Sequence, residues 1–249
     1  MPAFKDHFSG HAEAYARARP GYPAALFSWL AAQAPGATLA WDVGAGNGQV
    51  ASGLAGYFER VMATDASAQQ LAEARGPDNV TFQVEAAEHC SLDDGSVDLV
   101  TVGQALHWFD LPLFYAQVRR VLRAGGLFAA WTYQLNVIAP PIDALVQRFY
   151  HEVVGPYWPP ERVHVEQGYQ DLPFPFAELT TPDLPLQSQL TLPAYLAYID
   201  TWSSVRRYRE ARGQDPLVEL AAQLAQVWGD PEAARPVVWP LSLRAGCRI

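Results

Sequence analysis

Four residues near the end of a short apolar segment could bind a positively charged ligand. Asp42 stands just before a turn, and Gly44, Gly46 and Gly48 alternate after it. Glycines remove side chains where a strand turns into a helix, so a ligand can lie against bare backbone and meet the N–H groups of that helix. A carboxylate at this place repels a diphosphate and attracts a cation. The pattern therefore favours a ligand with an ammonium and a sulfonium group, such as S-adenosylmethionine.

Nicotinamide- and flavin-binding folds are the main alternative for a glycine-rich turn. Those folds use the spacing G-x-G-x-x-G, whereas Gln49 occupies the position of their third glycine in this chain. The spacing and the carboxylate of Asp42 together disfavour a nicotinamide oxidoreductase.

The residues after the next strands complete a predicted nucleoside site. A nucleoside on a doubly wound sheet needs an acidic residue after the second strand, where it binds the ribose hydroxyls, and Asp65, followed by Ala66, has this place. Ala87 is the expected neighbour of the adenine ring, with Glu88 beside it. Gln104 follows the fourth strand. These residues extend the predicted cofactor site beyond the glycine loop.

Short apolar segments that have strand character alternate with helical segments through the first half of the chain. The predicted strands cover residues 39–43, 61–64, 80–84, 97–102 and 127–131, and a predicted helix at 111–122 ends in basic residues and glycines. This alternation predicts an α/β fold with a doubly wound, mostly parallel sheet.

The order of these signals resembles the class I S-adenosylmethionine-dependent methyltransferases of the methyltransferase type 11 domain. The resemblance covers residues 39–132 and is carried by the glycine loop, the acidic Asp65, the run D-G-S-V-D-L-V at 94–100 and the run R-V-L-R-A-G-G-L at 120–127. Segments 19–23, 104–109 and 201–203 are similar to the trans-aconitate methyltransferase-like branch, which acts on small molecules. The family often has an acidic residue near the adenine where this chain has Ala86.

The resemblance implies a seven-stranded Rossmann-like sheet of order 3-2-1-4-5-7-6 with an antiparallel edge hairpin and a helical lid. We expect the hairpin from residues 184–192 and 237–243, and two lid helices at 193–212 and 216–227. The chain then divides into a cofactor-covering segment (1–35), a cofactor-binding core (36–135) and a remainder (136–249) whose substrate lid spans about 193–230.

Tyr15 and Arg19 lie in the segment that, by resemblance, folds over the cofactor. The planar fork of Arg19 could bind a carboxylate of the donor or of the acceptor. The alternative is a surface arginine beside a proline turn.

His107 is the candidate catalytic residue. Methyl transfer from a sulfonium is an in-line displacement that needs alignment and exclusion of water. A hydroxyl acceptor must also lose a proton, for which His107 is the best candidate base, whereas a carboxylate is already ionised at pH 7 and needs only positioning. The alternative is a structural imidazole that packs with Trp108 and Phe109.

Tyr198, Trp202 and Arg206 recur at a spacing of four residues and would share one face of a lid helix. This face either lines the substrate pocket, with His107 and Trp108, or packs in the core of the lid. Trp158 and Arg162 follow a similar argument with weaker support.

The composition limits the possible partners. The net charge is -9, from 17 basic and 26 acidic residues, and no dense basic run is present, which weighs against nucleic acid as a partner. No unbroken apolar stretch reaches about 18 residues, so we expect a cytoplasmic protein, monomeric or homodimeric, without membrane association. The two cysteines lack metal-ligand spacing, and no metal is expected.

The function most favoured by these patterns is O-methylation of a carboxylate-bearing metabolite, with S-adenosylhomocysteine as the second product. Two alternatives remain open. The acceptor could be a hydroxyl, amine or carbon of a quinone- or lipid-like molecule, or the protein could bind S-adenosylmethionine without catalysis.

Overall fold

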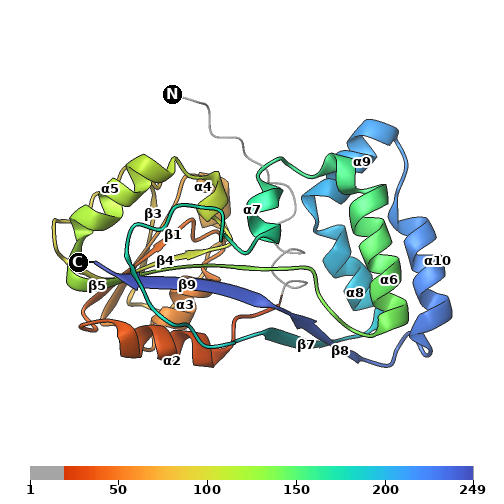
Figure 1. Cartoon of the computed structure of the whole chain (residues 1–249), viewed down its shortest axis with the longest axis horizontal. Helices are drawn as coiled ribbons and strands as arrows, with labels where there is room; N and C mark the ends of the chain where they lie inside the picture. The colour runs from red at the N-terminus through yellow and green to blue at the C-terminus, as the bar shows by residue number, and fades with distance from the viewer. Residues whose placement is uncertain (1–19, 249) are drawn as a thin grey trace.

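Seven strands form the central sheet of the computed structural model, which describes residues 20–248 (Figure 1). Their order is β3-β2-β1-β4-β5-β9-β6, and β9 runs antiparallel to both of its neighbours. Counted within this sheet alone, the order is 3-2-1-4-5-7-6, which confirms the predicted fold class. The strands are β1 (Leu39–Val43), β2 (Arg60–Asp65), β3 (Val80–Val84), β4 (Val97–Gly103), β5 (Leu122–Tyr133), β6 (Ala177–Glu178) and β9 (Leu241–Cys247).

Helices cover both faces of this sheet. Strand residues alternate between the faces: Trp41 packs on one side with Phe114 of α5, whereas Ala40 packs on the other with Leu26 of α2. Every residue of β1 is buried, as expected for a parallel strand that is covered on both faces. The helices of this region are α2 (Ala24–Gln33), α3 (Gln49–Leu54), α4 (Ala68–Ala72) and α5 (Leu111–Val121), and a 3₁₀ turn, η1 (Leu106–Trp108), follows β4.

A helical cap stands beside the sheet (Figure 1). It has its own apolar core. It contains α6 (Pro140–Arg148), α8 (Leu192–Asp200), α9 (Ser203–Arg212) and α10 (Leu217–Trp228), together with the π-helical turn η2 (Phe149–Val153) and the 3₁₀ turn η3 (Gly155–Tyr157). The short helix α7 (Arg162–Glu166) lies between the cap and the sheet. Among residues 20–248, no helix combines the length and the apolar character needed to cross a bilayer.

The predicted edge hairpin forms, but it lies outside the central sheet. Strand β7 (Leu186–Leu190) pairs antiparallel with β8 (Arg235–Trp239) as a separate two-stranded sheet. Pro240 separates β8 from β9, because proline has no N–H group for a sheet ladder, and its carbonyl accepts a hydrogen bond from the backbone of Gln134. The expectation of one strand over 237–243 was therefore wrong, and β6 supplies the edge instead.

The predicted lid helix over 193–212 is interrupted at Trp202. This residue has an extended conformation, with φ -70° and ψ 132°, and the hydroxyl of Thr201 closes α8 by donating to the carbonyl of Tyr198. Trp202 is buried in the core of the cap, so the chain bends where its ring packs. Tyr198 and Arg206 consequently belong to different helices, α8 and α9, and the single-helix face predicted for them does not exist.

Candidate functional site

The glycine loop lies at the carboxyl end of β1, and all of its glycines have left-handed backbone conformations. The φ angles of Gly44, Gly46 and Gly48 are 68°, 55° and 87°. A Cβ atom on Gly44 would meet the Cβ of Ala105 at 2.6 Å, whereas a Cβ on Gly46 would find only the Oε1 of Gln70 at 3.9 Å. Gly44 is therefore needed for packing within the protein. Gly46 instead has no close neighbour among residues 20–248 at this position, so a ligand can approach the backbone there.

Asp42 supplies a buried carboxylate behind this loop. Its Oδ1 accepts a hydrogen bond from the Thr101 hydroxyl at 3.0 Å, and its Oδ2 is buried without a hydrogen-bond partner in the described part of the chain. Burial raises the pKa of Asp42 to about 7, because a low dielectric disfavours the charged form. A cation bound nearby would compensate this charge. The orphaned oxygen and the open face of Gly46 thus fit a cationic donor.

Asp65 lies at the end of β2, next to the loop. Its Oδ2 accepts from the backbone N–H of Gly46 at 2.9 Å, and its Oδ1 accepts from the N–H of Ser67 at 2.8 Å. The carboxylate therefore joins the glycine loop to the start of α4, and Ala66, partly exposed, lies between these contacts. The position agrees with a residue beside the ribose, a role that stays a prediction.

The predicted adenine neighbours lie on the segment after β3. Ala87 is buried, at 6 % exposure, in the core between the sheet and α5. Glu88 accepts a hydrogen bond from the backbone N–H of Asp110 at 2.8 Å, which fastens this segment to the start of α5. One oxygen of Glu88 is thus engaged within the protein.

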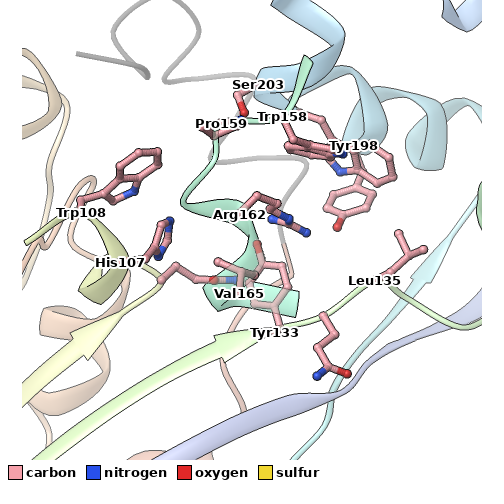
Figure 2. Close-up of a pocket in the computed structure, with 13 residues that line it drawn as sticks. His107, Trp108, Tyr133, Leu135, Trp158, Pro159, Arg162, Val165, Tyr198 and Ser203 are labelled. Atoms are coloured by element: carbon pink, nitrogen blue, oxygen red, sulfur yellow. The ribbon is translucent and has the colours of Figure 1, made fainter. Parts of the chain in front are cut away.

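A pocket of about 70 Å³ opens between the carboxyl ends of β4 and β5, helix α7 and the cap (Figure 2). It exceeds the space of a single water molecule, roughly 10 to 15 Å³ on this scale. Most of its lining is aromatic or uncharged. The residues are Gln104, His107, Trp108, Tyr133, Gln134, Leu135, Trp158, Pro159, Arg162, Val165, Tyr198, Trp202 and Ser203.

Two strained residues support the wall of this pocket near His107. Gln104 and Tyr169 have φ angles of 60° and 62°, and within 20–248 they are the non-glycine residues with positive φ. Gln104 is held by its N–H, which donates to the Trp131 carbonyl, and by its Oε1, which accepts from the Thr132 hydroxyl at 2.6 Å. Backbone strain of this kind persists where the surroundings enforce it and gathers at functional sites.

His107 lies on η1 at the edge of the pocket. Its Nδ1 is 2.8 Å from the Tyr169 hydroxyl, and the centroid of its ring is 4.6 Å from that of Trp108. Burial, with a smaller effect of the positive charge on Arg162, lowers the pKa of His107 to about 3. The imidazole is therefore neutral at pH 7 and is a weak base.

Arg162 brings a positive charge to the pocket from α7. Its Nε donates to the hydroxyl of Tyr150 at 2.7 Å, which in turn donates to a carboxylate oxygen of Glu166 at 2.7 Å. The guanidinium lies 4.5 Å from the ring centroid of Trp158. Its terminal nitrogens, Nη1 and Nη2, make no hydrogen bond with any described residue, so they can bind an anion in the pocket.

The structure gathers some of the predicted substrate residues and separates others. Tyr198 and Trp202 line the pocket and also pack in the cap core at 3 % and 4 % exposure, and their role toward a substrate stays a prediction. Arg206 does not line this pocket. Its Nε lies 3.8 Å from Oε1 of Glu210, one turn further along α9. Tyr15 and Arg19 fall outside the described residues.

Sequence reasoning missed several residues around the pocket. Tyr133 follows a predicted strand, and that position could have marked it, because side chains at the carboxyl ends of parallel strands face ligands. Tyr169 and Tyr150 carry no such signal, since each reaches the site through a long-range contact. Arg162, a candidate from the sequence together with Trp158, is the first residue of α7 and follows the turn after the proline pair at 159–160.

Comparisons with known proteins agree with this geometry. Residues 41–130 match the family described as the methyltransferase domain. A Dictyostelium discoideum protein named as a methyltransferase is 35% identical over 229 residues, covering 90% of this chain and 87% of that protein. A solved structure from Anaeromyxobacter dehalogenans, described as a type II methyltransferase, is 47% identical, with a TM-score of 0.88, and the match covers 93% of this chain and 98% of that one.

A more distant structure shares the fold alone. It is described as a methyltransferase from an antibiotic biosynthesis pathway of Anabaena variabilis and is 17% identical, with a TM-score of 0.56 over 91% of this chain and 99% of that one.

Proposed function

The chain belongs to the class I S-adenosylmethionine-dependent methyltransferases, and on that premise we propose that it methylates a carboxylate oxygen of a small molecule. The observation that carries this proposal is the guanidinium of Arg162, which presents unused donors beside the neutral ring of His107 in the pocket beyond β4 and β5.

The donor is assigned to the glycine-loop side of the molecule. Asp42 and the backbone at Gly46 would hold its cationic part, and Asp65 its ribose, on the grounds of the orphaned buried oxygen and the open face of the loop. When bound, S-adenosylmethionine supplies an electrophilic methyl group: the new O–C bond forms as the S–C bond breaks, and the electron pair leaves with sulfur as S-adenosylhomocysteine. The remaining proposed contacts are Gly44, Gly48, Ala66, Ala87, Glu88 and Gln104, with Tyr15 and Arg19 in the segment outside the described residues.

Charge and protonation support a carboxylate as the acceptor. A carboxylate is ionised at pH 7 and transfers no proton on methylation, so it needs a partner for its charge, which Arg162 provides. The described lining contains no acidic side chain, and a lone guanidinium repels an ammonium acceptor. His107, with its pKa near 3, would position the acceptor because its basicity is too low for efficient proton removal.

A hydroxyl acceptor is the second candidate. The contact between His107 and Tyr169 resembles the arrangement in which a partner orients a catalytic imidazole. In that case the depressed pKa would have to rise when the acceptor binds, and the reaction rate would depend strongly on this histidine.

Transfer of a labelled methyl group to matched acceptors tests the proposal. We expect carboxylic acids to be methylated in preference to alcohols and amines of the same skeleton. Arg162→Gln should lower kcat/KM for the carboxylic acids by about 30- to 160-fold, since removing a charged partner costs about 2 to 3 kcal/mol. Arg148→Gln is the matched control, because Arg148 is exposed on α6 and bonds Gln223. Preferred methylation of the alcohols would refute the carboxylate proposal.

A further inference from the structure

We infer that the acceptor has a flat, aromatic or conjugated body and a single carboxylate, which Arg162 binds while the body lies against the aromatic rings of the cap. This inference rests on the proposed function, because it names the substrate class of the same pocket. It is drawn from the shape of the lining, the number of charges in it and the hydrogen-bonding groups left unused.

Three rings form one wall of the pocket, which we call the aromatic wall: Trp158, Trp202 and Tyr198. The centroids of Trp158 and Trp202 are 5.7 Å apart, and those of Tyr198 and Trp202 are 5.9 Å apart. These residues come from separate segments of the cap, so the folded cap is required to assemble them. The planes of Trp158 and Trp202 are inclined by 44° and those of Tyr198 and Trp202 by 89°, so the wall combines ring faces and ring edges, the two arrangements that aromatic partners favour.

The opposite side of the pocket is also aromatic. Figure 2 shows His107 and Trp108 on the side of the sheet, and Trp158 and Tyr198 on the side of the cap, with Arg162 between the two groups. A ligand in this space meets rings on both sides. An aromatic body can meet a ring face on one side and a ring edge on another, and such aromatic pairs are favoured over contacts with a branched aliphatic body.

The number of charges in the lining indicates a single carboxylate. Arg162 is the one lysine or arginine among the described lining residues. Its Nε is already used by Tyr150, which leaves the edge formed by Nη1 and Nη2 for one bidentate carboxylate. The other polar lining residues, Gln104, Gln134 and Ser203, are neutral. Among the described lining residues, a second or third carboxylate would lose hydration without gaining a charged partner.

One further donor is available for the same ligand. The indole Nε1 of Trp158 is buried and has no hydrogen-bond partner within 20–248, and buried polar groups normally have one. The guanidinium of Arg162 stacks on this ring. A carboxylate or another oxygen of the acceptor can satisfy a donor on a residue that already lines the pocket.

Calorimetric binding in the presence of S-adenosylhomocysteine tests the inference independently of turnover. The probes are benzoate, cinnamate and indole-3-acetate, compared with hexanoate and with citrate. We expect the aromatic monocarboxylates to bind at least about tenfold more tightly than hexanoate or citrate, the difference that one good aromatic contact supplies. Equal or tighter binding of citrate, or no binding of any aromatic probe at millimolar concentration, would overturn the inference.

Two variants with matched controls assign the preference to these residues. Trp158→Leu should remove the advantage of the aromatic probes over hexanoate, whereas Trp29→Leu, which replaces a partly buried indole on α2, should keep it. Arg162→Gln should weaken the binding of all three aromatic probes, whereas Arg148→Gln should leave their binding unchanged. An aromatic preference that survives Trp158→Leu at full size in the folded protein would contradict the role of the wall.

The two proposals fail in different ways. Methylation of hydroxyl compounds in preference to carboxylic acids would refute the proposed function. Methylation of carboxylic acids with tricarboxylates as the best substrates would leave the proposed function intact and refute only the single-carboxylate inference.

Discussion

The phenolic oxygen of Tyr169 lies 2.8 Å from Nδ1 of His107, and this contact joins the turn after α7 to the 3₁₀ turn after β4. The backbone of Tyr169 is strained, with φ 62°, and its carbonyl accepts a hydrogen bond at 2.7 Å from Nη1 of the buried Arg244 on β9. The central sheet therefore fixes the orientation of His107 from two sides, through η1 and through Tyr169.

The effect of removing His107 distinguishes positioning from base catalysis. We expect His107→Gln to lower kcat by less than about tenfold, because general base catalysis contributes roughly 10² to 10⁴ and a group with a pKa near 3 supplies little of it at pH 7. The pH dependence of kcat between pH 6 and 9 should be the same in both proteins. A thousandfold loss, together with the disappearance of an acidic limb from the wild-type profile, would support a hydroxyl acceptor instead.

Asp42 should make the free protein less stable as the pH rises. Its folded-state pKa of about 7 lies above the model-compound value of 3.8, so the folded protein retains a proton that the unfolded chain loses, and stability falls between these two values. Asp42→Asn removes this dependence. In urea unfolding we expect the free energy of unfolding of the variant to exceed that of the wild type by on the order of 2 to 4 kcal/mol at pH 8. The difference should be smaller at pH 5. A difference that is constant between the two pH values would contradict the raised pKa.

Gly46→Ala should impair donor binding more than folding. Among the described residues, the added methyl group meets only the Oε1 of Gln70, at 3.9 Å, and it projects into the open face of the loop. Gly95→Ala is the matched control, since Gly95 also has a positive φ of 61° and nothing within 4 Å of the new atom. Both variants should lose about 1 to 2 kcal/mol of stability from the left-handed backbone. Calorimetry should show weaker binding of S-adenosylmethionine for Gly46→Ala alone, and equal affinities would place the donor elsewhere.

Asp65→Ala should weaken the binding of S-adenosylmethionine by about 1 to 3 kcal/mol, the range for removing a partner from buried hydroxyls. The structure adds a second expectation, because the same carboxylate holds the N–H groups of Gly46 and Ser67. Hydrogen exchange of those two amides should therefore accelerate even without the donor. Unchanged affinity combined with faster exchange would restrict Asp65 to a structural role in the loop.

The sheet could be predicted from the sequence because its signals are local. Residues 39–43 and 80–84 are strands with the predicted bounds, since a buried parallel strand appears as a short apolar run between turn signals. The glycine loop was recognisable for the same reason. Three alternating glycines after an acidic residue permit the left-handed backbone conformations of this turn whatever surrounds them.

The cap could not be predicted to the same extent because its geometry depends on long-range packing. The helix is interrupted at Trp202, whose ring is buried in the core of the cap. The periodic spacing of Tyr198, Trp202 and Arg206 gave no sign of this interruption. Pro240 divides a strand between two sheets. Arg162 is oriented by Tyr150 through a hydrogen bond that no local pattern encodes. The acceptor pocket is built from such contacts, which is why the donor side of the site was easier to predict.

The chemical stability of the product is the most direct test of methyl transfer to a carboxylate. The protein is incubated with S-adenosylmethionine that carries a labelled methyl group and with an aromatic monocarboxylic acid, and the labelled product is then treated with alkali. A methyl ester is hydrolysed, so our account predicts that the label is released as volatile methanol. Label that remains on the product after alkali, as in a methyl ether, a methylamine or a C-methyl compound, would contradict it.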